Sequence, residues 1–319
     1  MATFEEAAMK HSMIETNGIT MHVVEEGEGK PVLFCHGFPD TWHGWRPQMR
    51  AVAGAGYRAI AVDMRGFGRS SAPPEADKYT PFHTVGDLIG VLDALDLPTA
   101  VIVGHDFGAS VAWNAAMMRP DRFAAVFGIS VPFRPRGDAS FLQQLRAAGK
   151  DGFYMFSQMM PEADAAWADA ARTIPRALYW LSGTPEPTER FDVFDPGLQF
   201  HREAPAALPP WADPDDVAYT VSEFQRTGFH GGLNYYRAVQ LGFDLSAPFK
   251  GALVRQPSFF VRGQVDALNA LGGGTVEELR RVLPDLRGYL DLEGVGHWPQ
   301  REAPHAVSDA LIAFLKELD

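Results

Sequence analysis

Two hydrophobic patterns alternate along most of this chain. Nearly continuous apolar runs that end in Gly or Asp are typical of parallel strands covered on both faces. Between these runs, apolar residues recur every three or four positions, as at Val85, Leu88, Ile89, Leu92 and Leu95, which predicts helices. The alternation predicts a doubly wound, mostly parallel sheet. The strand-like runs are PVLFCHG (31–37), YRAIAVDMRG (57–66), AVIVGHD (100–106), FAAVFGIS (123–130), PSFFVRG (257–263) and LRGYLDLEG (286–294).

The two ends of the chain carry other patterns. The segment 14–26 alternates apolar and polar residues on either side of Asn17–Gly18, which predicts an opening antiparallel hairpin. Thr80 followed by Pro81 marks the start of a helix. The last predicted helix has one apolar face, made of Val307, Leu311, Phe314, Leu315 and Leu318.

The rhythm of strand and helix is interrupted between residues 133 and 247. This segment contains many Phe, Tyr, Trp, Met and Pro residues and no Val/Ile run of the strand type. We expect a helical cap inserted into the sheet domain. The predicted division is a core of residues 1–132 and 248–319 and a cap (lid) domain of residues 133–247.

The run at 100–106 ends in a tight turn centred on Asp106. Gly104 and Gly108 flank it, as a sharp strand-to-helix turn requires, and the helix N-terminus favours a negative charge there. A carboxylate can displace a leaving group at an sp3 carbon and so form an alkyl ester. Asp106 is therefore a candidate nucleophile. The alternative is that Asp106 only caps the following helix.

An ester on Asp106 would have to be hydrolysed, which needs a general base and an orienting acid. In chains with this turn, the histidine comes last in the order nucleophile, acid, histidine. His297 follows the last strand-like run, and Asp266 follows the one before it. We expect these two residues to be the base and its acid, with Asp291 and Glu293 as rival acids.

Ester hydrolysis also needs an oxyanion hole of two backbone N–H groups. One is expected from Phe107, directly after the nucleophile. The other is expected from Phe38, in the turn that follows the first parallel strand. His36 in the same turn is interpreted as a structural residue rather than a base.

Four motifs carry a resemblance: HGFPD (36–40), GHDFGA (104–109), GFHGGLNYYR (228–237) and GHW (296–298). Along nearly its whole length the chain resembles the epoxide hydrolases of the α/β-hydrolase fold, including the soluble kind. The motif in the cap is the more specific one, since related dehalogenases share the other three. The resemblance implies an α/β-hydrolase fold and conversion of epoxides to vicinal diols.

Two cap tyrosines hydrogen-bond the epoxide oxygen in these enzymes. The resemblance assigns this role to Tyr236, with Tyr235 as a rival one place away, and to Tyr154 in GFYMFSQMMPEADAA (152–166). A phenol is neutral at pH 7 and can donate a proton to an alkoxide. The alternative is that both tyrosines are packing residues of the cap.

The chain departs from the family pattern at two positions. Asp40 follows HGFP, where family members often carry Glu near the hydrolytic water. Phe107 stands where many relatives have Trp, and dehalogenases usually present indole N–H groups to the halide. Relatives that cleave fluoroacetate tend to have Arg there. Phe107 thus argues against both kinds of dehalogenase.

Composition limits the partners. The net charge of −12 argues against nucleic acid and anionic membranes. Cys35 is the only cysteine, so no internal disulfide can form. No apolar run approaches the roughly 18 residues of a membrane helix, and the N-terminus has no apolar signal region. We expect a cytoplasmic protein with no cofactor and no metal. The expected partners are an epoxide and water, and whether the chain forms a homo-oligomer stays open.

The sequence thus predicts an epoxide hydrolase that works through an ester on Asp106. A bulky or aryl epoxide is expected from the apolar residues of the cap. A haloalkane or haloacid dehalogenase with the same nucleophile is the alternative, and a catalytically idle binding scaffold is a further one. The residues expected to line the substrate pocket are Trp42, Phe153, Met155, Met159 and Trp298.

Overall fold

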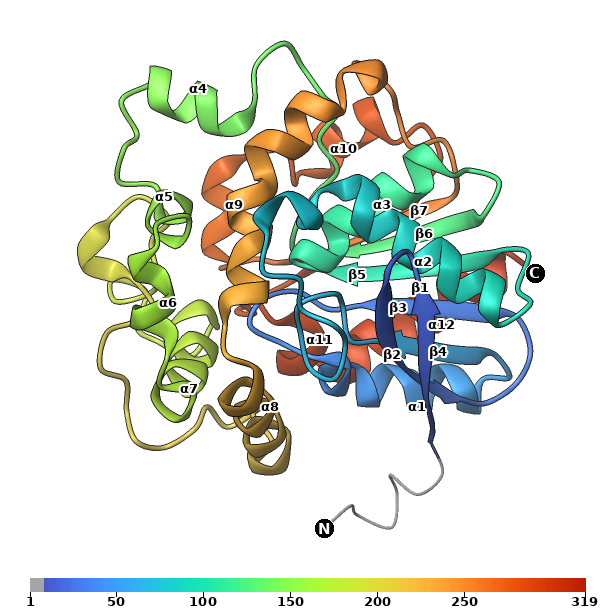
Figure 1. The fold of residues 1–319 in the computed structure, drawn as a ribbon, viewed down its shortest axis with the longest axis horizontal. Coiled ribbons are helices and arrows are strands. Elements are labelled where there is room, and N and C mark those ends of the chain that lie inside the picture. The colour runs from blue at the N-terminus through green and yellow to red at the C-terminus, as the bar shows by residue number, and fades with distance from the viewer. Residues whose placement is uncertain (1–8) are drawn as a thin grey trace.

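The computed structural model describes residues 9–319, and within them one sheet of eight strands runs through the molecule (Figure 1). Its strand order is β1-β2-β4-β3-β5-β6-β7-β8. Strands β3 to β8 pair in parallel, whereas β1 and β2 pair antiparallel, as do β2 and β4. The strands are β1 (Lys10–Thr16), β2 (Ile19–Glu26), β3 (Pro31–Cys35), β4 (Arg58–Val62), β5 (Ala100–His105), β6 (Phe123–Ile129), β7 (Ser258–Gly263) and β8 (Leu286–Leu292). The predicted doubly wound sheet and its opening hairpin are confirmed.

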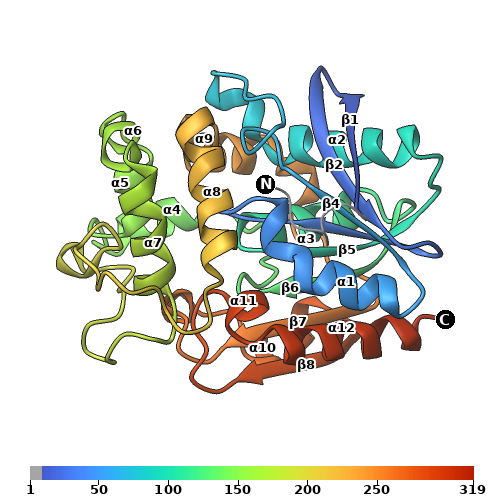
Figure 2. The same ribbon diagram turned by 90° about the horizontal axis from the view of Figure 1, so that it is seen from below.

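Helices cover both faces of the sheet because its parallel strands are apolar on both sides. Helices α1 (Arg46–Gly54) and α12 (Pro304–Glu317) lie side by side over one face (Figure 2), where Val307, Leu311 and Phe314 are buried. Helices α2 (Pro81–Ala94) and α3 (Phe107–Met118) pack into the hydrophobic cluster of the other face. Helix α2 begins at Pro81 as predicted, although the Thr80 side chain does not cap it.

The segment between β6 and β7 forms only helices and loops, which agrees with the predicted helical character of residues 133–247. The helices gather beyond one end of the sheet (Figure 1). The exact division into core and cap stays a prediction. The helices of this segment are α4 (Phe141–Ala147), α5 (Tyr154–Gln158), α6 (Glu162–Trp167), α7 (Ala170–Leu181), α8 (Pro214–Thr227) and α9 (His230–Leu245). Two further helices, α10 (Val276–Val282) and α11 (Pro299–Glu302), belong to the last part of the chain.

The topology determines where a ligand can reach the sheet. From β3 the chain passes to β4 on one side and later to β5 on the other, so the strand order reverses between β3 and β5. Open α/β sheets bind ligands at the carboxyl ends of the strands on either side of such a reversal. Two turns meet at this point, the one after β3 that begins with His36 and the one after β5 that contains Asp106. The helices α4 to α9 lie beyond this end of the sheet (Figure 1).

Candidate active site

The turn that carries Asp106 is as sharp as the glycines predict. Asp106 has φ 55° and ψ −121°, a strained conformation for a residue with a side chain. A Cβ on Gly104 would lie 2.1 Å from the Gly108 carbonyl oxygen, and a Cβ on Gly108 would lie 2.0 Å from the Cys35 oxygen. Only glycine fits at either position. Because both residues lack a side chain, strand β5 and helix α3 approach closely, and the tight turn between them raises Asp106 above the sheet.

The Asp106 side chain does not cap the helix that follows it. Helix α3 shows no hydrogen bond from its own first turn to this carboxylate. Instead, Asp106 Oδ1 accepts a hydrogen bond of 2.9 Å from the backbone N–H of Phe38. The alternative interpretation of Asp106 as a helix cap is therefore wrong. The N–H of Phe107, the second expected oxyanion donor, is the first of α3 and has no acceptor within that helix.

His36 holds the turn that presents Phe38. Its Nδ1 lies 2.8 Å from the Gly37 carbonyl oxygen, and its Nε2 accepts a hydrogen bond of 3.0 Å from the backbone N–H of Met64. The ring is buried and both of its nitrogens are engaged. These contacts fit the structural role that the sequence suggested for His36.

His297 lies between two carboxylates. Its Nδ1 is 3.0 Å from Asp266 Oδ2, and its Nε2 is 3.5 Å from Asp106 Oδ2. The rival acid Asp291 instead forms a bidentate pair with Arg262, and Glu293 is exposed. Asp266 is therefore the carboxylate that the fold brings to His297.

The protonation of this cluster follows from its charges. Burial alone would lower the pKa of His297, but the charge of Asp266 and hydrogen bonds to Asp106 and Asp266 outweigh it and raise this pKa to about 10. Burial would raise the pKa of Asp106, but the hydrogen bond and charge of His297 hold it below its usual value. At pH 7 the resting site thus contains an anionic Asp106 beside a protonated His297.

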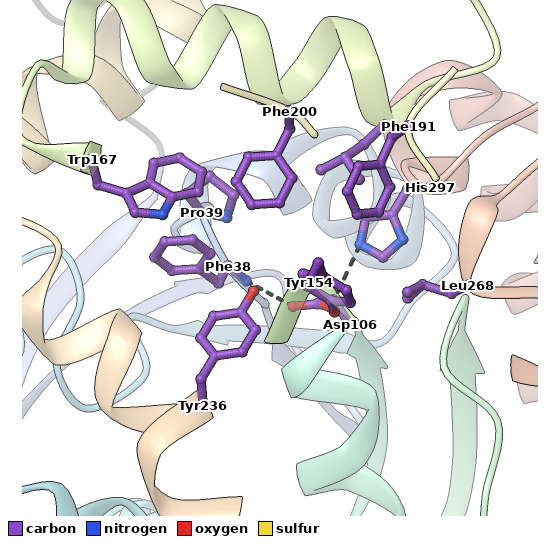
Figure 3. A pocket seen from close by; sticks show the side chains of 11 residues that line it. Phe38, Pro39, Asp106, Tyr154, Trp167, Phe191, Phe200, Tyr236, Leu268 and His297 are labelled. Carbon is purple, nitrogen blue, oxygen red and sulfur yellow. Dashed lines mark hydrogen bonds and ion pairs between the residues drawn. The ribbon is translucent and has the colours of Figure 1, made fainter. Parts of the chain in front are cut away.

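Tyr154 and Tyr236 reach the same cavity from two helices. Tyr154 begins α5, Tyr236 lies in α9, and their ring centroids are 6.2 Å apart. The Tyr236 hydroxyl points toward the Asp106 carboxylate (Figure 3). Burial, followed by the charge of Asp106 and other neighbours, raises the pKa of each phenol well above 10. The rival Tyr235 faces away and donates to the carbonyl oxygen of Arg65 at 3.1 Å.

These side chains enclose a small, mostly apolar cavity of about 20 Å³. No local sequence motif predicts most of the apolar residues that line this cavity. Only the abundance of aromatic residues in 133–247 pointed to them. Figure 3 shows the lining side chains. Besides Asp106, Tyr154, Tyr236, His297 and Phe38, the lining residues in the described part of the chain are Pro39, Trp167, Leu181, Phe191, Phe200 and Leu268.

The five residues expected to line the substrate pocket are not among those that line this cavity. Phe153 directly precedes α5 and is buried, and Met155 follows Tyr154 on that helix, about 100° round its axis. Both pack into the hydrophobic cluster of the cap. Met159 likewise packs in the cap. Trp42 donates to the Tyr219 hydroxyl at 2.9 Å, on the far side of the sheet. Trp298 is fully buried beside the His105 ring.

Comparisons with known proteins agree with this geometry. The profile of the α/β hydrolase fold family matches residues 30–304. A protein of Caballeronia sordidicola named epoxide hydrolase is 57% identical over 98% of this chain and 95% of its own length. The chain belongs to the epoxide hydrolases of the α/β-hydrolase fold.

Solved structures of epoxide hydrolases also superpose on almost the whole chain. One from an endophytic Streptomyces has a TM-score of 0.91 at 37% identity, over 98% of this chain and 96% of its own. Another, from Vigna radiata, has a TM-score of 0.87 at 34% identity, over 99% of this chain and 100% of its own. The fold and the family prediction are thereby confirmed.

This epoxide hydrolase has a second, much larger cavity of about 600 Å³ beside the first. Phe107 and Tyr235 line it, together with Trp113 and Phe133. The Phe107 ring also packs against the Tyr236 ring, with centroids 4.7 Å apart. A thin aromatic wall thus separates the larger cavity from the side chains around Asp106.

Asp40, the departure from the family pattern, does not line the small cavity. Its Oδ1 accepts from the backbone N–H of Thr41 at 2.9 Å and lies 3.4 Å from Arg301 Nη1. Its contacts therefore join the turn after β3 to helix α11.

Residues 9–319 contain no cluster of three or more His, Cys, Asp or Glu side chains arranged to hold a metal ion. Within the same residues, no helix combines the length and the apolar character needed to cross a membrane.

Proposed function

We propose that this chain hydrolyses epoxides to vicinal diols in two steps, with Asp106 as the nucleophile. The observation that carries the proposal is that Asp106, His297, Tyr154 and Tyr236 converge on one small cavity. The first step needs a carboxylate and proton donors on opposite sides of the ring that opens. The second step needs a base next to the ester.

In the first step the Asp106 carboxylate attacks an epoxide carbon and the ring C–O bond breaks. Tyr154 and Tyr236 are neutral at pH 7 because their pKa values lie well above 10, so they can donate to the developing alkoxide. Burial in an apolar cavity strengthens these hydrogen bonds. The Phe38 N–H holds one carboxylate oxygen and so fixes the direction of attack.

Formation of the ester changes the state of His297. The ester is neutral, so it removes the Asp106 charge that helps to keep the imidazole protonated. The alkoxide takes a proton from a phenol, and the protonated His297 gives up its proton to restore that phenol. His297 is then neutral. The neutral imidazole, oriented by Asp266, takes a proton from water, which attacks the ester carbonyl carbon. Phe38 and Phe107 donate to the oxyanion, and loss of the diol restores the ion pair.

Replacement of the base tests this scheme. The variant His297→Gln should accumulate an adduct of protein plus epoxide, since alkylation needs no base and hydrolysis does. Intact-mass spectra, followed by peptide mapping to Asp106, would detect it. His305→Gln, which changes an exposed histidine in α12, is the matched control and should turn over without an adduct. An epoxide consumed by His297→Gln with no adduct would contradict the scheme.

A dehalogenase with the same nucleophile is disfavoured by the donors around Asp106. Phe107 has no N–H on its side chain. The indole of Trp167 lines the small cavity, but its Nε1–H already donates to Gln158 Oε1 at 2.7 Å. We expect diol from styrene oxide or stilbene oxide and no halide from haloalkanes or haloacetates. Halide release without diol would reject the proposal in favour of dehalogenation.

Two finer points belong to the same proposal. The aromatic walls of the small cavity, Trp167, Phe191 and Phe200, support a bulky or aryl epoxide as substrate, and a shift of the Phe107 ring would join this cavity to the mostly apolar 600 Å³ one. The cytoplasmic location remains the one expected from the sequence. Fractionation of cells that produce the native chain would test it.

A further inference from the structure

The backbone of His297 is bonded directly to the helical segment above it. Its N–H donates to the Leu181 carbonyl oxygen, at the end of α7, at 2.9 Å. The neighbouring glycines allow this contact, because a Cβ on Gly296 would lie 2.3 Å from the Ser182 carbonyl carbon. A Cβ on Gly183 would lie 1.8 Å from the Gly294 oxygen. The His297 loop and the end of α7 therefore touch backbone to backbone.

Glu302, the last residue of α11, bridges the same two segments. Its Oε2 accepts from the N–H of Gly183 at 2.8 Å and from that of Gly296 at 3.0 Å. Its Oε1 accepts from the N–H of Trp298 at 3.0 Å and from that of Gly296 at 3.1 Å. One carboxylate thus holds the residues on either side of His297 and the residue two places beyond Leu181.

The opposite side of the loop is held by the sheet. The His297 carbonyl oxygen lies 2.7 Å from His105 Nε2 and accepts from Ser130 Oγ at 3.0 Å. These contacts fix only one peptide group. The direction of the imidazole also depends on the peptide planes of Gly296 and Trp298, which Glu302 holds.

We propose that Glu302 is a positioning residue for the second step, which orients His297 toward the ester and couples it to the end of α7. This inference rests on the proposed function. Leu181 lines the small cavity, so the same clamp fixes an apolar wall of the site. Glu302 does not itself line that cavity in the described structure, and it acts through the backbone.

The chemistry of the clamp requires a carboxylate. Its donors are all backbone N–H groups, and an ionised carboxylate offers only acceptors. In Glu302→Gln the side chain keeps its size, but its NH₂ group would face an N–H group. One end of the bridge would then lose its hydrogen bonds, and the imidazole would lose its alignment with the attacking water.

The kinetic consequence is specific to one step. Alkylation of Asp106 does not use His297 as a base, so its rate should stay near that of the wild type. Hydrolysis of the ester should slow roughly 10- to 100-fold, the usual effect of a displacement of about 1 Å in a catalytic group. Once hydrolysis limits turnover, kcat and KM fall by the same factor and kcat/KM is unchanged.

The experiment is rapid-quench intact-mass spectrometry on Glu302→Gln with styrene oxide in a single turnover. It measures the rise and decay of the Asp106 adduct, and steady-state kcat and KM are measured in parallel. Glu293→Gln is the matched control, since it makes the same change at an exposed position in the same loop. The decay rate of the adduct does not depend on how much of the variant is folded, because only folded enzyme is alkylated.

Slow decay with unchanged kcat/KM in Glu302→Gln, and wild-type behaviour in Glu293→Gln, supports the inference. Adduct decay at the wild-type rate overturns it. A lower kcat at constant KM, with normal decay, also overturns it, because that pattern reports only less folded enzyme. If diol forms and no adduct appears even in His297→Gln, the proposed ester mechanism fails as well, which separates the two failures.

Discussion

Tyr235 and Tyr236 are neighbours in the sequence with different surroundings in the fold. The hydroxyl of Tyr235 donates a hydrogen bond to the Arg65 carbonyl oxygen, whereas Tyr236 lines the small cavity with Asp106. Tyr236→Phe and Tyr154→Phe should each lower kcat/KM for an epoxide roughly 100-fold, a typical loss for a proton donor. Tyr235→Phe is the matched control and should stay near wild type. The rate of diol formation from styrene oxide gives kcat/KM for all three variants. If kcat/KM falls equally in all three, both cavity tyrosines are packing residues and not proton donors.

The pH dependence of stability is a second test at the level of single residues. The folded-state pKa of His297 is raised from 6.5 to about 10, so its stabilisation is complete below pH 6.5 and is lost as the pH rises toward 10. The difference in unfolding free energy between wild type and His297→Gln should therefore shrink from pH 6.5 to pH 10. Urea unfolding across this range measures it. A difference that does not shrink over this range would mean that His297 is neutral in the resting enzyme.

Motifs predicted the residues that we propose for the chemistry better than those that form the walls of the cavity. Asp106, Asp266 and His297 follow strand ends, and parallel strands bring their carboxyl ends together, so their meeting follows from local patterns. Trp167 and Phe200 reach the cavity through the packing of helices and loops that no short motif encodes. The expectation for Phe153 and Met155 came from their proximity to Tyr154 in sequence. In the fold Phe153 precedes the first turn of α5, and Met155 points in another direction on that helix.

At the scale of elements, the strand–turn–helix unit around Asp106 depends on two glycines for space. In Gly108→Ala the new methyl would meet the Cys35 carbonyl oxygen at 2.0 Å. We expect the free energy of unfolding to fall by about 1–3 kcal/mol, as for an overpacked core. Gly54→Ala at the end of α1 meets nothing within 4 Å and should stabilise by about 0.5–1 kcal/mol. Denaturant titrations of both variants check the opposite signs.

The predictability of the elements follows their patterns. The strands were predictable because both faces of the sheet are covered and the runs are apolar throughout. The hairpin was fixed by Asn17–Gly18, whose residues have φ 45° and 76°. Between β6 and β7 the helical character was predictable but the helix ends were not. Helices such as α5 and α6 have only 5 and 6 residues, too short for a periodic signal.

At the scale of the molecule, one buried ion pair joins distant parts of the chain. Arg65, after β4, donates to both oxygens of Asp87 in α2, at 2.6 and 2.5 Å. Asn17 of the hairpin also donates a hydrogen bond to Asp87, at 3.0 Å. The Arg65 carbonyl oxygen accepts a hydrogen bond from the hydroxyl of Tyr235 in α9. The hairpin, the sheet, α2 and α9 therefore share one polar network.

Loss of charge from this network should affect the whole fold. Asp87→Asn leaves a buried guanidinium without its carboxylate and should lower the free energy of unfolding by about 3–5 kcal/mol. Asp121→Asn removes the partner of the exposed Arg119 and should change the free energy of unfolding little, because water screens that pair. Thermal and urea unfolding compare the two variants. Equal effects would show that Arg65 is solvated or finds another partner.

The lone thiol at the centre of the sheet has a practical consequence. Cys35 ends β3, is fully buried, and burial raises its pKa, so the reactive thiolate is rare in the folded state. A thiol-reactive dye should therefore label the native enzyme only as fast as the sheet opens. Every variant discussed above then carries a natural single-site reporter of global unfolding. Its labelling rate ranks their stabilities in dilute buffer, without denaturant and without an engineered probe.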